Sequence, residues 1–193
     1  MRKFVVALLL LLSVAFFAAK IADIYKVKEG ETVEATGIVL APVGVLGTLT
    51  TYIQDETAGI MLYGNRLPAD LKVGQVIKVV GKTKIYYDIL EIIPDKVEII
   101  GTATPTAVEL KDGDFKKYLS NLVNVVGTVK SVEKYQFTVK TDKFEILIYI
   151  RKEVPFNVST LKVGDKVSVT GVMYLYKGMY EILPRTPEDI KKF

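Results

Sequence analysis

The chain has 193 residues, a formal net charge of +4, and no cysteine, histidine or tryptophan. The missing residue types exclude disulfides, thiolate or imidazole metal sites, and catalytic triads that use His or Cys. The net charge is far smaller than that of a dedicated duplex-DNA binder. Abundant Lys, Ile, Val and Tyr would suit a heat-adapted organism, a thermophile, with many surface ion pairs.

The first nineteen residues have the pattern of a secretory signal peptide. Met1-Arg2-Lys3 precedes an apolar run from Phe4 to Ala19, and a basic start followed by such a run directs export. The run is shorter than the roughly 20 residues of a membrane-spanning helix. Because Phe17 is not the small residue expected before a cleavage site, an uncleaved N-terminal anchor stays open. We expect an exported protein, periplasmic or extracellular, with membrane contact only if this segment is retained.

Residues 20–193 contain two copies of one unit, offset by ninety residues. The matching blocks are 33–39 with 123–129, 71–76 with 161–166, Gly81 with Gly171, and 91–94 with 181–184. The first copy has a longer early loop at 41–47, and the second has a longer late stretch at 151–160. We therefore expect two domains, 20–104 and 105–193.

Each copy has the composition of five short strands bounded by Gly, Pro, Asn and Asp. The expected strands are 31–41, 49–55, 59–64, 75–83 and 86–93 in the first copy, and 121–132, 135–141, 144–151, 165–174 and 179–183 in the second. Residues 67–71 should form a turn or short helix, and residues 114–119 a short connector helix. Gly37 and Gly127 sit inside the long first strands, where a glycine permits a bend. The predicted fold is all-β, with two tandem five-stranded OB-fold barrels.

Several of these segments also resemble a known class of module. Residues 52–60, 71–74 and 90–92, together with the connector from Pro105 to Val129, are similar to OB-type modules found in tandem beside extracellular bacterial nucleases. The resemblance covers nearly all of residues 20–193, and its motifs mark the barrel rather than an active site. Because no nuclease domain accompanies them in this sequence, the resemblance implies a binding module without the enzyme.

Acidic residues offer the remaining route to metal chemistry. Asp55-Glu56 and the pair Asp112 and Asp114 could supply oxygens to Ca²⁺ or Mg²⁺. The string 55–59 also has turn composition, which favours a structural role between the second and third strands. We expect no metal, no cofactor and no enzymatic activity.

Strand alternation predicts where a ligand would bind. OB folds use the outer face of strands 2 and 3 and the loops between strands 1–2 and 4–5. With Ile53, Ile60 and Leu62 inward, Met61 and the polar or aromatic residues beside it face outward. The predicted ligand-binding residues are Tyr52, Gln54, Tyr63, Tyr86, Tyr87, Lys140, Tyr149, Arg151, Tyr176 and Lys177. An outward tyrosine that packs against the other copy is the structural alternative.

Three functions fit this pattern. Tyrosines among lysines suit single-stranded nucleic acid, and residues 105–193 carry 15 basic against 11 acidic side chains, whereas residues 20–104 carry 9 against 11. An ordinary lysine-rich surface explains that excess equally well. The alternatives to nucleic acid are a glycan or cell-wall polymer, and an adaptor role with a protein partner in the cell envelope.

Overall fold

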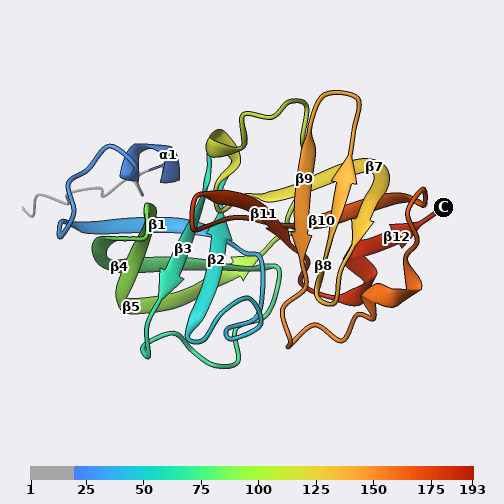
Figure 1. The fold of residues 1–193 in the computed structure, drawn as a ribbon. Helices are drawn as coiled ribbons and strands as arrows, with labels where there is room; N and C mark the ends of the chain where they lie inside the picture. The colour runs from blue at the N-terminus through green and yellow to red at the C-terminus, as the bar shows by residue number, and fades with distance from the viewer. Residues whose placement is uncertain (1–19) are drawn as a thin grey trace, which may run out of the picture.

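The computed structural model describes residues 20–193, which form two β-barrels side by side (Figure 1). The predicted signal segment, 1–19, lies outside the described residues. A short helix, α1 (Ile21–Ile24), precedes the first barrel and buries both isoleucines in its core. Within residues 20–193, no helix has the length and apolar character needed to cross a membrane.

The first barrel closes in the strand order β1-β2-β3-β5-β4, and its strands are coloured blue to green in Figure 1. They are β1 (Thr32–Val39), β2 (Thr50–Gln54), β3 (Gly59–Tyr63), β4 (Gln75–Tyr86) and β5 (Ile89–Thr102). Alternating residues such as Ile53, Leu62 and Ile77 fill the interior completely shielded from solvent. The predicted turn at 67–71 buries Leu67 and Leu71 in the same core.

The second barrel repeats this arrangement, with β10 pairing to both β7 and β11. Its strands are β7 (Leu122–Val132), β8 (Gln136–Lys140), β9 (Glu145–Tyr149), β10 (Lys166–Tyr176) and β11 (Met179–Leu183). The short strands β6 (Val108–Glu109) and β12 (Ile190–Lys192) extend its sheet, and the single turns η2 (Val158–Thr160) and η3 (Pro187–Asp189) lie in its loops. The predicted all-β fold of two five-stranded barrels is confirmed.

The pairing registers reproduce the ninety-residue repeat. Val33 pairs with Gly81 in the first barrel, and Val123 pairs with Gly171 in the second. A Cβ on Gly81 would lie 2.3 Å from the Ile93 carbonyl oxygen, and one on Gly171 would lie 2.6 Å from that of Leu183. Neither position has room for a side chain, because the neighbouring strand passes too close.

Two elements differ from the sequence-based expectation. The fourth and fifth strands run further than predicted, because Lys84–Tyr86 continue the ladder to the turn and β5 continues beyond Pro94. A register shift between Val80 and Gly81 lies opposite Pro94, and a bulge is where a strand tolerates proline. The predicted short connector helix is present as a 3₁₀ turn, η1 (Phe115–Tyr118). Phe115 packs on Phe144 of the second barrel, as predicted.

A separate apolar cluster joins the two barrels. From the first barrel it contains Leu40, Leu46, Tyr52, Met61 and Ile89, and from the second Leu122, Val172 and Leu183. The outer faces of β2 and β3 are therefore covered by the outer faces of β10 and β11. Since these residues are all nearly or fully buried, the barrels form one packed body in this structure.

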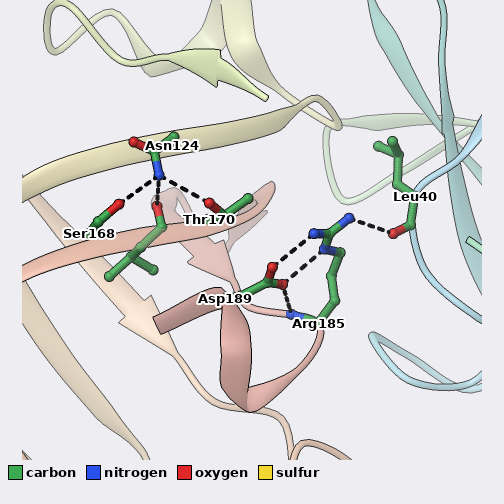
Figure 2. Close-up of polar contacts among 7 residues, drawn as sticks. Leu40, Asn124, Ser168, Thr170, Arg185 and Asp189 are labelled. Carbon is green, nitrogen blue, oxygen red and sulfur yellow. Dashed lines mark hydrogen bonds and ion pairs between the residues drawn. The ribbon is translucent and has the colours of Figure 1, made fainter. Parts of the chain in front are cut away.

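One arginine adds a polar contact to this interface. The Arg185 guanidinium donates to both carboxylate oxygens of Asp189, at 2.8 and 2.9 Å, and to the Leu40 carbonyl of the first barrel at 3.0 Å (Figure 2). Arg185 therefore ties the C-terminal turn of the second barrel to the end of β1.

Within the second barrel, Asn124 donates to Ser168 and Thr170, which fixes β7 against β10 (Figure 2).

Candidate ligand-binding cleft

A cleft with a volume of about 270 Å³ opens between the barrels. The first barrel contributes polar and aromatic side chains from four strands, namely Thr50, Tyr52, Tyr63, Lys84, Tyr86 and Glu91. The second barrel contributes Arg151 and Tyr174. Strand alternation places the first set on one face, since Ile53, Leu62 and Ile92 point into the barrel core. The cleft therefore gathers aromatic, cationic and anionic groups from both copies.

Arg151 forms one wall of the cleft. Its guanidinium carbon lies 5.3 Å from the ring centre of Tyr149 and 5.4 Å from that of Tyr174, within the range of cation–π attraction. Its Nη2 is 3.9 Å from the Glu181 carboxylate. The Arg151 Nε is buried without a hydrogen-bond partner among the described residues. These contacts hold a positive charge in place beside the cleft.

Two buried glutamates lie at equivalent positions of the repeat, Glu91 and Glu181. Burial raises the pKa of the Glu91 carboxyl, and Lys84 only partly offsets this effect. Burial likewise raises the pKa of Glu181, against a smaller opposing effect of Arg151. Both carboxylates also help to raise the pKa of Tyr52, although its own burial is the largest cause. Both glutamates thus occupy surroundings that disfavour the charged form of their carboxyl groups.

The predicted open platform of Tyr52 and Met61 is wrong in one respect. Both residues do face away from their own barrel, but the second barrel covers them, and Tyr52 is 1% exposed. The packing of one copy against the other, considered above as the alternative, accounts for Tyr52. Tyr63 and Tyr86 remain partly exposed at the mouth of the cleft, and Tyr149 stacks behind Arg151.

Gln54 has a structural position rather than an open one. Its side-chain amide donates to the Thr106 carbonyl and accepts from the Leu122 amide, at 3.0 and 2.8 Å. It borders a larger hollow of about 540 Å³ along the connector. Because its polar groups are already bonded to the chain, we place the candidate site at the smaller inter-barrel cleft.

Lys140 lies far from the residues with which it was grouped. In the β8–β9 ladder Lys140 pairs with Glu145, whereas Gln136 pairs with Tyr149. Four residues along a strand separate the two positions by about 13 Å. Lys140, predicted above as a ligand-binding residue, therefore lies apart from Tyr149 and outside the inter-barrel cleft.

The other predicted aromatic residues occupy two equivalent hairpin tips. Tyr87 and Asp88 form one two-residue turn, and Lys177 and Gly178 form the other, all four with positive φ. Tyr87 is 76% exposed, and a left-handed backbone is unusual for a tyrosine. Tyr176 is also exposed, with the Lys177 ammonium 5.2 Å from its ring centre.

Asp55 forms a turn, as its sequence context favours. Its carboxylate accepts from the amides of Ile21, Thr57 and Ala58 and from the Thr57 hydroxyl. Partial burial works to raise the pKa of Asp55, but these hydrogen bonds outweigh it and lower the pKa below its ordinary value. Within residues 20–193, no cluster of three or more acidic side chains is placed to hold a metal ion.

Sequence reasoning missed Lys84 and Glu91 at the candidate site, and Glu181 beside its Arg151 wall. Glu91 and Glu181 did stand out in the repeat, each followed by two apolar residues and a proline. A charged residue within an otherwise apolar strand indicates a special environment. That signal was available, but the burial of both glutamates depends on the packing between barrels.

Fold and site together define a tandem OB-type protein with a polar, aromatic cleft between its barrels. Its sequence is similar to Endonuclease YhcR of Bacillus subtilis (strain 168), with 28% identity over 183 residues. The match covers 83% of this chain but 15% of that protein. The predicted resemblance to part of a bacterial nuclease is confirmed. No protein-family model matches the chain.

Similar solved structures include tetrameric p202 HIN2, with a TM-score of 0.40, 11% identity, and coverage of 86% of this chain and 96% of that one. A murine DNA-binding protein bound to double-stranded DNA gives a TM-score of 0.38 and 11% identity, with coverage of 83% and 97%.

Proposed function

We propose that the protein is an exported, non-catalytic module that binds single-stranded nucleic acid at the inter-barrel cleft. The observation that carries this proposal is the convergence of Tyr63, Tyr86 and Arg151 on one opening from two barrels. Aromatic rings stack on any base, and cationic side chains attract the phosphate backbone. Similarity to part of an endonuclease favours a nucleic-acid ligand over other polymers.

Tyr63, Tyr86 and Lys84 lie at the mouth of the cleft, and Arg151 lies on its opposite wall. Tyr63 and Tyr86 are partly exposed, so a base can reach their rings. Lys84 lines the same opening with about half of its side chain exposed, and its ammonium is 5.5 Å from the Tyr86 ring centre. Arg151 approaches from the opposite barrel. A nucleic-acid strand crossing the mouth would contact both copies at once.

The export part of the proposal is supported by the basic and apolar start of the sequence, residues 1–19.

Fluorescence anisotropy with labelled single-stranded DNA and RNA tests this proposal. Tyr63→Ala should weaken binding by about 5- to 150-fold, the equivalent of roughly 1 to 3 kcal/mol of stacking. Tyr63→Phe retains the ring and should bind nearly as well as the original protein. Lys84→Ala should reduce the salt dependence by about one phosphate contact. Lys96→Ala, an exposed lysine on β5 outside the cleft, is its matched control.

Two results would contradict the proposal. Absence of binding to any single-stranded oligonucleotide at micromolar protein and low salt would remove the nucleic-acid ligand. Salt-independent binding of neutral oligosaccharides, lost in Tyr63→Ala, would assign the same cleft to a glycan instead.

A further inference from the structure

The Glu91 carboxylate lacks the hydrogen bonds that a buried charge requires. Its side chain is 2% exposed, and its one ion-pair contact within residues 20–193 is with the Lys84 ammonium at 4.0 Å. That separation is too long for a hydrogen bond, and no described residue donates to this carboxylate. Buried charged groups are normally paired and hydrogen-bonded. The Glu91 oxygens are not among the fully enclosed side-chain atoms of residues 20–193 that lack a partner, so a donor can reach them from the cleft.

The Glu91 carboxylate is nevertheless accessible from the cleft, because it forms part of the cleft lining. Its repeat counterpart differs in this respect, since Glu181 does not line the cleft and lies next to Arg151. Lys84 sits at the rim with its side chain half exposed. Of the two glutamates, Glu91 alone presents unsatisfied acceptor oxygens to a ligand inside the cleft.

The surrounding side chains restrict the shape of that ligand. Tyr52, Tyr63 and Tyr86 border the same space as Glu91, so a flat ring can stack while its edge meets the carboxylate. The volume of about 270 Å³ lies below the roughly 300 Å³ lower limit of typical small-molecule sites. One nucleobase suits this space better than a longer segment of polymer.

Nucleobases differ in what their pairing edges offer to a carboxylate. Guanine presents a ring N–H and an amino group side by side, which match the two oxygens. Cytosine and adenine present one amino group. Thymine and uracil present one N–H between two carbonyl oxygens, which the carboxylate repels. Burial also raises the pKa of Glu91 in the absence of donors, and a ligand N–H would relieve that cost.

We infer that Glu91 reads the pairing edge of one base held in the cleft, so that the protein prefers guanine and disfavours thymine and uracil. This inference rests on the proposed function, because it specifies the ligand of the same cleft. A well-formed carboxylate–base pair discriminates by about 1 to 3 kcal/mol, which corresponds to about 5- to 150-fold in affinity.

The test uses thymidine oligonucleotides in which one central nucleotide is thymidine, guanosine, cytidine or inosine. The guanosine probe should bind about 5- to 150-fold more tightly than the thymidine probe. Inosine lacks the amino group but keeps the ring N–H, so its affinity should fall between them. Glu91→Gln should bring the affinities for the guanosine and thymidine probes to within about twofold of each other, because the neutral amide no longer repels the thymine carbonyl oxygens. Glu98→Gln, at an exposed site further along β5, should leave the preference unchanged.

The possible failures are distinguishable. If the protein binds all four probes equally, or if Glu91→Gln retains the guanosine preference, the role of Glu91 is wrong while the proposed function stands. If no probe binds, both proposals fail. If Glu91→Gln instead abolishes binding of a neutral oligosaccharide, the missing donors are sugar hydroxyls and the base-reading role is overturned.

Discussion

Replacement of Arg185 by alanine should destabilise the protein and loosen the two barrels against each other. The Arg185 and Asp189 side chains are 14% and 9% exposed, so the variant leaves a buried carboxylate without its partner. Breaking a buried ion pair in this way costs about 3 to 5 kcal/mol. Loss of the hydrogen bond to the Leu40 carbonyl adds about 0.5 to 1.5 kcal/mol.

Urea unfolding followed by circular dichroism measures this cost from the midpoint and slope. The matched control is Arg66→Ala, which removes an ion pair with Asp95 in which both side chains are more than half exposed. Exposed pairs contribute about 0 to 1 kcal/mol, so the control should lose little stability. A double variant with Asp189→Asn should recover part of the loss, since the uncompensated charge disappears. If Arg185→Ala loses no more free energy of unfolding than Arg66→Ala, the assignment of Arg185 to a buried, stabilising ion pair is wrong.

Three further predictions concern stability. Gly171→Ala should lower the free energy of unfolding by about 1 to 3 kcal/mol, because the added Cβ would meet β11. Gly101→Ala is the control and should be neutral or slightly stabilising, because no atom lies within 4 Å of the added carbon. Equal melting temperatures for the two variants would contradict this prediction. The raised pKa values of Glu91 and Glu181 contribute stability below the unfolded-state pKa that is lost as pH rises through the folded-state values. The Glu91→Gln and Glu181→Gln double variant should therefore gain stability relative to the original protein as the pH rises from the ordinary glutamate pKa through the folded-state values. A difference in the free energy of unfolding that does not change with pH would contradict this. The lowered pKa of Asp55 acts in the opposite sense, so Asp55→Asn should destabilise the protein at neutral pH. The loss in free energy of unfolding should shrink as the pH falls through the folded-state pKa of Asp55. Chemical denaturation at several pH values measures this loss, and a loss that grows in acid would contradict the prediction.

The sequence predicts the barrels well because their information is local and repeated. Alternation of residues such as Ile53 and Ile60, turn-forming glycines and the ninety-residue offset each specify strands without reference to distant parts of the chain. Strand ends were less accurate where tertiary structure overrides a local signal. Pro94 is the clearest case, because the bulge at Gly81 allows β5 to continue through it.

The site was less predictable because it depends on how the barrels pack. Alternation assigned Tyr52 and Tyr63 to the same outer face, yet Tyr52 is buried and Tyr63 is 39% exposed. Nothing within the first copy distinguishes them, since the difference comes from Val172 and Leu183 of the second copy. The same packing buries Glu91 and brings Arg151 to the cleft. The residues that form contacts between the two repeats have no regular spacing in the sequence, so periodicity does not predict them.

The places where the two copies differ explain why their similar faces enclose an asymmetric cleft. The longer early loop of the first copy supplies Leu46 and Gly47 to the cleft, and the longer late stretch of the second begins with Arg151. Each insertion thus reaches the space between the barrels. Two identical barrels meeting through the same face would give matching groups on both walls. Here one wall presents Glu91 and Lys84 and the other presents Arg151 with Glu181 behind it. Such asymmetry suits a ligand with unlike ends, such as a nucleotide with its base and phosphate.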